Sequence, residues 1–149
     1  MHKTVRLGVD VGKARIGVAR TDIDGTMAVP VETVKRDENA IKNICAIIEE
    51  HDADIVYVGL PLSLSGDQTA STADAITFSQ DLSQATTAHI RLVDERLSTV
   101  SATSSLQAAG HNAKSAKAII DQAAAVVILE HALSIEKTSQ NWAGRSLDE

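Results

Sequence analysis

Hydrophobic and polar residues alternate along residues 5–19 in a way that predicts two strands joined by a tight turn. Leu7 and Val9 occupy every second position of the first strand, which is the period of a β-strand. Gly12 interrupts the alternation, which resumes at Ile16. We therefore expect an antiparallel β-hairpin at the start of the chain.

Apolar runs in the rest of the sequence predict three more strands and four helices. The expected strands are one over 27–35, which Pro30 marks as irregular or at a sheet edge, an interior strand over 55–59 and a strand over 89–93. The expected helices span 37–51, from 71 or 72 to 84, 98–110 and 118–133. Early strands joined by turns favour antiparallel pairing, and later strands reached through helices favour parallel crossovers. The predicted fold class is α/β, with a mixed five-stranded sheet and helices on both faces.

Length and composition favour one globular domain. The 149 residues are 44% hydrophobic and 23% charged, which is ordinary for a globular protein. We expect the domain to span residues 1–136 and to be followed by a flexible tail over 137–149. The single cysteine, Cys45, lies on an apolar helix stripe, where we expect a core role, and it suits a reducing compartment. Neither a signal peptide nor a membrane span is evident, so we expect a cytoplasmic protein without a membrane partner.

Charge is distributed unevenly along the chain. The net charge of −6 argues against broad, non-specific binding to nucleic acid. Basic residues nevertheless dominate residues 1–20, and acidic residues dominate residues 37–54. One end of the fold could therefore be basic while another is acidic, which leaves a nucleic-acid face open.

Three acids stand at positions where a carboxylate needs a partner. Asp10 ends the first strand, Glu95 follows the last strand, and Asp121 lies within a helix that is apolar on nearly every side. Ligands of such sheets gather at the carboxyl ends of the strands, where Asp10 and Glu95 are expected. Three converging carboxylates would form a site for Mg²⁺ or Mn²⁺, which can support phosphodiester hydrolysis.

Each acid also has a simpler interpretation. Asp10 could accept hydrogen bonds from backbone amides of the turn at Gly12. Glu95 could pair with Arg96 or Arg91 at the surface. Asp121 could cap its own helix if that helix begins at residue 117 or later. The spacing of the residues leaves these alternatives open.

Several polar residues near the proposed acids could contact phosphate groups. The candidates are Lys13, Arg15, Ser63, Arg96, Lys114 and Lys117. Solvated surface charge is an equally good explanation for each basic residue, and a plain connecting loop is the default for Ser63.

Four segments together resemble the YqgF family of small bacterial proteins in the ribonuclease-H-like superfamily. They are LGVDVGKARIGVA, YVGLPLSLSG, VDERLST and IIDQAAAVVILE, in this order, and they span about residues 5–133. The resemblance implies a ribonuclease-H-like fold and a nuclease that depends on a divalent metal. It also implies that the family's acidic triad corresponds to Asp10, Glu95 and Asp121, with Arg96 orienting the acids or contacting phosphate.

The family has been linked to two substrates, the 5′ end of precursor 16S ribosomal RNA and the Holliday junction. The resemblance therefore favours a nuclease acting on precursor ribosomal RNA, with structured DNA as an alternative. Ribosomal particles are expected partners, and the protein could be a monomer or a homodimer. A symmetric dimer would favour junction cleavage, because two phosphates must be cut in concert.

Two other function classes compete with a nuclease. A nucleic-acid-binding module without catalysis would not need three acids, because carboxylates repel phosphates unless a metal intervenes. An actin-like ATPase or sugar kinase also has a phosphate loop resembling DVGKARIGVA. That fold encloses ATP between two lobes, and 149 residues supply only one.

Overall fold

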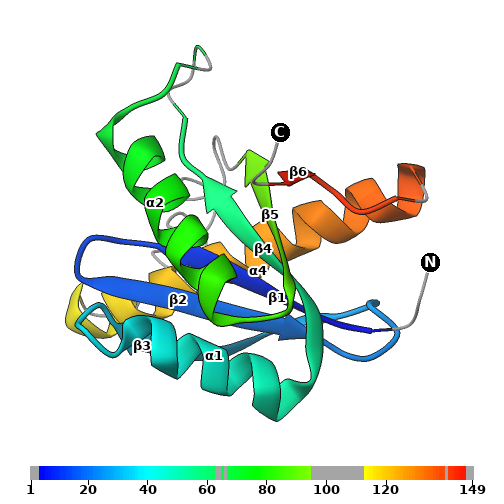
Figure 1. Ribbon diagram of the computed structural model, residues 1–149, viewed down its shortest axis with the longest axis horizontal. Coiled ribbons are helices and arrows are strands. Elements are labelled where there is room, and N and C mark those ends of the chain that lie inside the picture. The colour runs from blue at the N-terminus through cyan, green and yellow to red at the C-terminus, as the bar shows by residue number, and fades with distance from the viewer. Residues whose placement is uncertain (1–3, 63–64, 66, 95–112, 140, 147–149) are drawn as a thin grey trace.

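The computed structural model describes residues 4–62, 65, 67–94, 113–139 and 141–146, with residues 113–121 and 145–146 at the level of the backbone. Its centre is a mixed sheet in the order β3-β2-β1-β4-β5-β6 (Figure 1). The strands are β1 (Val5–Val11), β2 (Arg15–Thr21), β3 (Ala28–Lys35), β4 (Ala53–Leu60), β5 (His89–Asp94) and β6 (Arg145–Ser146).

Strand pairing follows the predicted pattern. β1, β2 and β3 are antiparallel neighbours, whereas β4 runs parallel to β1 and β5 runs parallel to β4. The edge position predicted for β3 is confirmed, and its register with β2 shifts beside Pro30. The five predicted strands are therefore all present, and β6 adds a short sixth.

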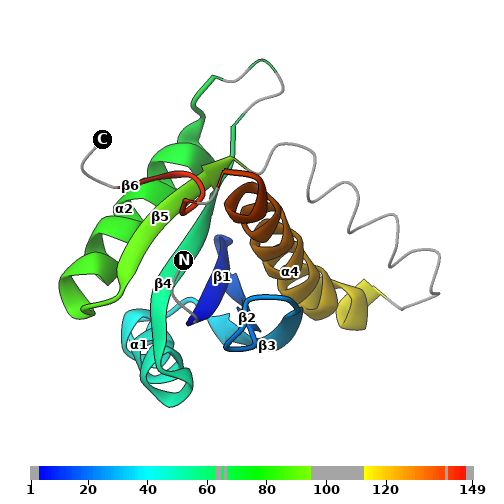
Figure 2. The same ribbon diagram turned by 90° about the vertical axis from the view of Figure 1, so that its right-hand side faces the viewer.

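Helices cover both faces of the sheet (Figure 2). The helices α1 (Ala40–His51) and α2 (Ala70–Ala85) lie on one face, and α4 (Ala113–Ser139) lies on the other. Successive residues of each strand point to opposite faces of the sheet and so belong to two separate hydrophobic clusters. Leu7 and Val9 belong to the cluster under α1 and α2, whereas Tyr57 belongs to the cluster under α4.

The helix boundaries differ from the predicted ones by a few residues. The first helix begins after Asn39 rather than at Asp37, whose carboxylate instead accepts a hydrogen bond from the Asn39 amide at 2.9 Å. The second begins after Thr69, whose hydroxyl caps the Thr72 amide. The helix expected over 98–110 lies outside the described residues. A side-chain cap marks the start of α2, whereas Asn39 makes no such hydrogen bond at the start of α1. Several neighbouring Ser, Thr, Asp and Asn side chains are candidate caps, so the sequence alone does not select among them.

α4 approaches the sheet closely at Gly8. A Cβ atom at this position would lie 2.6 Å from the Ala125 carbonyl oxygen and 2.9 Å from the Leu129 Cβ, which is closer than real Cβ contacts allow. Gly8 shares its face of β1 with Arg6 and Asp10, because side chains alternate along a strand. The absent side chain therefore lets the α4 backbone rest directly on β1.

A buried ion pair fastens the other end of α4 to the sheet. Arg6 Nε donates to both carboxylate oxygens of Glu136, at 2.8 and 3.0 Å, and both residues are about 5% exposed or less. The Tyr57 hydroxyl donates to Glu136 and accepts from the Ala143 amide at 3.2 Å. Burial raises the pKa of Tyr57, so its hydroxyl remains protonated and available as the donor. The network therefore attaches both α4 and the segment that follows it to the sheet.

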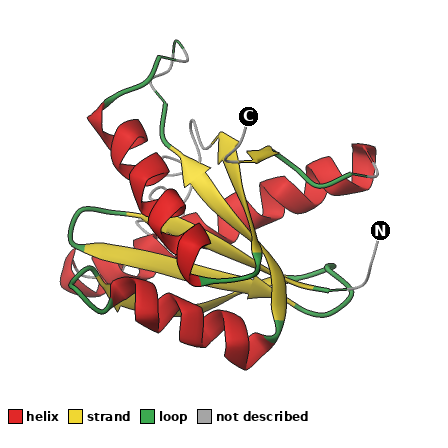
Figure 3. Cartoon of the chain, in the orientation of Figure 1, coloured by secondary structure: helices red, strands yellow, loops and turns green. Residues whose placement is uncertain are grey.

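This arrangement corrects the expectation for the chain end. We expected the last helix over 118–133 and a flexible tail from residue 137, but α4 extends from Ala113 to Ser139 and β6 pairs with β5 (Figure 3). Arg91 reinforces the pairing by donating to the Ala143 and Gly144 carbonyls at 2.6 and 2.7 Å. Within the described ranges, none of the helices combines the length and apolar character that a membrane crossing needs.

We predict that Gly8→Ala lowers the free energy of unfolding by about 1–3 kcal/mol, because the new methyl group must push α4 away from β1. Urea denaturation followed by circular dichroism measures the change. An unchanged midpoint would mean that α4 does not rest on β1 at this residue.

Candidate active site

Asp10 lies near the carboxyl end of β1, half-buried on the face that α4 covers. It pairs in register with Gly17 on β2, which in turn pairs with Thr33 on β3. Directly opposed residues of antiparallel strands point to the same face. Asp10, Gly17 and Thr33 therefore form a row across the sheet beneath α4, and Gly17 places no side chain between the other two.

α4 crosses this row near Asp121. Gln122 Nε2 donates to Thr33 Oγ1 at 3.0 Å, which fixes the level of the helix over β3. From Gly8 to Asp10 the strand advances about 6.7 Å, and from Ala125 back to Asp121 the helix advances about 6.0 Å toward the same end of the sheet. The backbone of Asp121 therefore reaches the end of the sheet where Asp10 lies. Because α4 begins at Ala113, Asp121 is within the helix, and the alternative that it caps the helix start is wrong.

Two of the glycines around Asp10 lie against backbone. The space at Gly8 is filled by α4, and a Cβ at Gly12 would meet the Arg15 carbonyl oxygen at 2.5 Å. These two glycines serve close backbone packing, and only Gly17 lies in the row beside Asp10.

Two of the predicted basic residues lie in the turn that follows Asp10. The Gly12 amide donates to the Arg15 carbonyl at 2.9 Å, which closes the turn between β1 and β2. Lys13 is exposed at this turn, and Arg15 is half-buried at the start of β2. The turn therefore presents positive charge at the same end of the sheet as Asp10.

The other candidates are less completely described. Ser63, Glu95 and Arg96 lie outside the described residues. Lys114 and Lys117 lie in the first part of α4, where only the backbone is described. Among the side chains that the structure describes, no three His, Cys, Asp or Glu gather as a metal would require. The triad and its contacts therefore stay predictions, with Asp10 and the backbone of Asp121 placed at one end of the sheet.

Sequence reasoning missed an ion pair that borders this site. Arg36 follows β3 and donates to both oxygens of Asp74 on α2, at 2.5 and 2.8 Å, and also to the Gly12 carbonyl at 3.0 Å. The hydrogen bonds to Arg36 hold the pKa of the Asp74 carboxyl below its usual value of 3.8, with a smaller contribution from the charge of Lys13. The partners are 38 positions apart, so no local pattern could reveal them.

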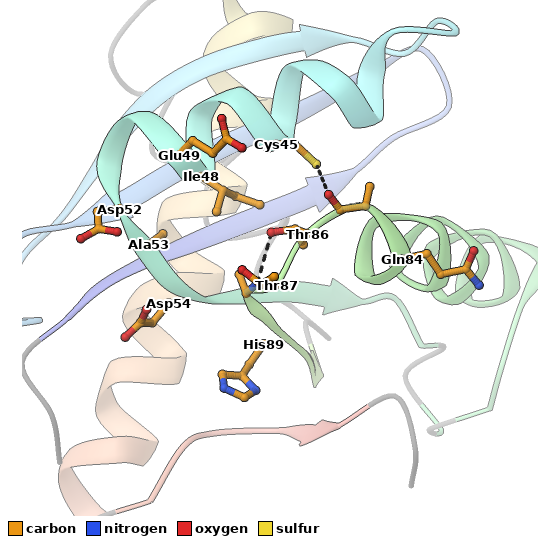
Figure 4. Close-up of a pocket in the computed structure, with 12 residues that line it drawn as sticks. Cys45, Ile48, Glu49, Asp52, Ala53, Asp54, Gln84, Thr86, Thr87 and His89 are labelled. Atoms are coloured by element: carbon orange, nitrogen blue, oxygen red, sulfur yellow. Dashed lines mark hydrogen bonds between the residues drawn. The ribbon is translucent and has the colours of Figure 1, made fainter.

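A groove at the opposite end of the sheet is poorly suited to nucleic acid (Figure 4). It has a volume of about 510 Å³ and lies where β4 and β5 begin, with Glu49, Asp52 and Asp54 around it. These acids repel phosphate groups. Cys45 lines the groove, packs against the core and donates to the Ala85 carbonyl at 3.6 Å, and burial raises its thiol pKa, all of which agrees with a structural role.

Comparison with known sequences identifies a family and close relatives. The model of the RuvX family, described as Holliday junction resolvase, matches residues 4–135. A protein of Leifsonia xyli named as a candidate pre-16S rRNA nuclease is 49% identical over 150 residues, covering 99% of this chain and 97% of its own. A protein of Clavibacter michiganensis with the same name is 53% identical over 142 residues, covering 93% and 88%.

Comparison of structures supports the fold. The RuvC protein of Thermus thermophilus, solved in complex with a Holliday junction substrate, superposes with a TM-score of 0.55. The alignment covers 91% of this chain and 97% of RuvC, at 17% sequence identity. Together with the family match, this likeness confirms the predicted ribonuclease-H-like fold.

We predict that the Arg36–Asp74 pair makes stability depend on pH in the acid range. The native state lowers the pKa of Asp74, so the pair stabilises the fold above the unfolded value of 3.8 and loses this contribution as the pH falls below it. Urea unfolding of the wild type and Asp74→Asn should differ at about pH 6 and converge as the pH falls through the lowered native pKa. A difference that stays constant over this range would contradict the assignment.

Proposed function

The chain belongs to the RuvX family, and on this basis we propose that it is a metal-dependent endonuclease that matures the 5′ end of precursor 16S ribosomal RNA. The names of its relatives supply the substrate. One structural observation carries the catalytic part of the proposal. The row that begins at Asp10 meets α4 at Gln122, next to Asp121.

The three acids proposed for this end of the sheet have the chemistry that a hard divalent cation requires. Asp10 supplies carboxylate oxygens, and carboxylates are the ligands that Mg²⁺ and Mn²⁺ prefer. Asp121 on α4 is the proposed second acid, and Glu95, one residue beyond the described end of β5, is the proposed third. A bound divalent cation supplies an activated water and stabilises charge on the leaving oxygen.

The roles of the protein residues follow from this placement. β1 carries Asp10 and α4 carries the backbone of Asp121, so the two proposed ligands come from separate elements. Groups that start from regular secondary structure need little reorganisation during a reaction. The exposed Lys13 and the half-buried Arg15 neutralise phosphate groups of the approaching strand. Ser63, Arg96, Lys114 and Lys117 are proposed as further contacts to the nucleic acid.

Cleavage of a Holliday junction is the second candidate function. The description of the matching family model and the fold shared with RuvC favour it. The chemistry is the same, and only the substrate and the assembly differ. A homodimer would support this candidate, whereas association with ribosomal particles would support the first.

We predict that Asp10→Asn abolishes cleavage that depends on Mg²⁺ or Mn²⁺, because an amide keeps the shape of the side chain but removes the charge that holds the cation. The assay places a precursor 16S 5′-leader RNA beside a four-way DNA junction. We expect the wild type to cut the RNA and the variant to lose at least about two orders of magnitude in rate.

Asp54→Asn is the matched control, because it removes an acid from the groove at the opposite end of the sheet. Its activity should equal that of the wild type. Cutting of the junction alone would transfer the proposal to the second candidate. Binding of either substrate without any metal-dependent cleavage would favour a non-catalytic module instead.

We predict that Lys13→Ala weakens RNA binding without abolishing catalysis, because it removes one phosphate contact from the exposed turn. Fluorescence anisotropy over a series of salt concentrations should show a slope of log K against log salt that is smaller by about 0.7–0.9. An unchanged slope would show that Lys13 makes no phosphate contact.

A further inference from the structure

Arg36 connects three parts of the molecule that are distant in sequence. Its backbone amide donates to the Ala14 carbonyl at 3.0 Å, and its guanidinium donates to the Gly12 carbonyl at 3.0 Å. The same guanidinium forms the two-pronged pair with Asp74 and lies 5.3 Å from the centre of the Phe78 ring. The turn after Asp10 is therefore attached to α2 through one side chain.

α2 is itself fixed to the end of β4. The buried Thr72 hydroxyl donates to the Pro61 carbonyl, directly after β4 ends at Leu60. Asp74 is two residues farther along α2. Because β1 and β4 are parallel neighbours, the contacts of Arg36 and Thr72 lie at the carboxyl end of the sheet. Together they join the segments that leave β1 and β4.

The Arg36–Asp74 pair differs from an ordinary surface ion pair. The side chains of Arg36 and Asp74 are 22% and 39% exposed, respectively. The guanidinium donates to both carboxylate oxygens of Asp74 and also to the Gly12 carbonyl in the turn. Exposed single pairs contribute little, because they are solvated and lose side-chain entropy. A lysine could not reproduce this contact, because it lacks the planar fork that spans both carboxylate oxygens.

We propose that Arg36 is a positioning residue of the candidate active site, which holds the turn at Gly12 so that Asp10 and Lys13 keep the geometry that catalysis requires. The inference rests on the proposed nuclease function, since Asp10 is its central acid. Asp10 is two residues before Gly12, and Lys13 follows it. A displaced turn therefore moves the end of the strand that carries Asp10. It also moves the charged side chain of Lys13 beside the substrate.

The expected size of the effect follows from the sensitivity of catalysis to geometry. A displacement of about 1 Å can slow a reaction about 100-fold. We therefore expect Arg36→Met to lower kcat by roughly 10- to 100-fold, with a smaller change in KM. Arg36→Lys keeps the charge and one hydrogen bond, and it should recover part of this loss.

The test combines three measurements on the full chain. Amide hydrogen exchange by NMR reports on the Gly12 amide, which bonds to Arg15 across the turn. Calorimetric titration with Mn²⁺ in the absence of nucleic acid reports on the acidic site. Steady-state cleavage of the precursor RNA separates kcat from KM. Arg20→Met is the matched control, because Arg20 lies at the end of β2 away from the turn, and within the described part of the chain its guanidinium donates to the Thr21 carbonyl at 3.4 Å.

The proposal predicts that Arg36→Met speeds exchange of the Gly12 amide, weakens Mn²⁺ binding and lowers kcat, whereas Arg20→Met matches the wild type in all three. Unchanged exchange at Gly12 would overturn the proposal. So would faster exchange with unchanged Mn²⁺ affinity and kcat, because Arg36 would then serve stability alone.

Failure of the proposed function has a different signature. In that case the wild type itself neither binds Mn²⁺ at Asp10 nor cleaves either nucleic acid, whatever Arg36→Met does to the turn. Circular dichroism of each variant shows whether it folds. If Arg36→Met does not fold, Asp74→Asn replaces it, because it removes the charge and one of the two oxygens that anchor Arg36 to α2 while leaving the bond from Arg36 to Gly12 in place.

Discussion

The direct contact between α4 and β1 at Gly8 is the constraint on which the rest of the structure depends. A side chain at this position would collide with the helix backbone. Because the helix backbone contacts the strand directly here, residues before and after this contact on α4 are held next to particular residues of the sheet. The Arg6–Glu136 pair closes one end, and the other end brings the backbone of Asp121 to the level of Asp10. A metal site assembled from a strand and a helix requires this kind of rigid register.

The two ends of the sheet have opposite electrostatic character. The turn after β1 carries Lys13 and Arg15 beside the candidate acids, whereas Glu49, Asp52 and Asp54 surround the groove at the other end. This separation would allow a chain with a net charge of −6 to bind the nucleic acid proposed as its substrate. Attraction at the basic end is local, and the acidic end disfavours binding of the substrate in the reverse orientation.

Much of the fold could be predicted from the sequence, because strong local patterns carry it. The alternation around Leu7 and Val9 predicts β1, and the apolar segment at Tyr57 predicts an interior strand. The start of α4 at Ala113 was missed because its first turns have no apolar stripe, and β6 is too short to show a pattern. The Arg36–Asp74 pair was missed because it depends on tertiary structure that brings the segment after β3 to α2. The triad could be proposed from strand ends and family resemblance, and its closure around a metal remains a prediction.

Paramagnetic broadening by Mn²⁺ tests the central claim most directly, namely that Asp10 and Asp121 share one divalent cation. Substoichiometric Mn²⁺ is added to the labelled protein, and the NMR amide signals are followed. The account predicts that signals of residues 9–12 and 119–123 broaden together and that Asp10→Asn restores both sets. Broadening confined to residues 49–54, at the acidic groove, would contradict it, as would broadening of either expected segment without the other.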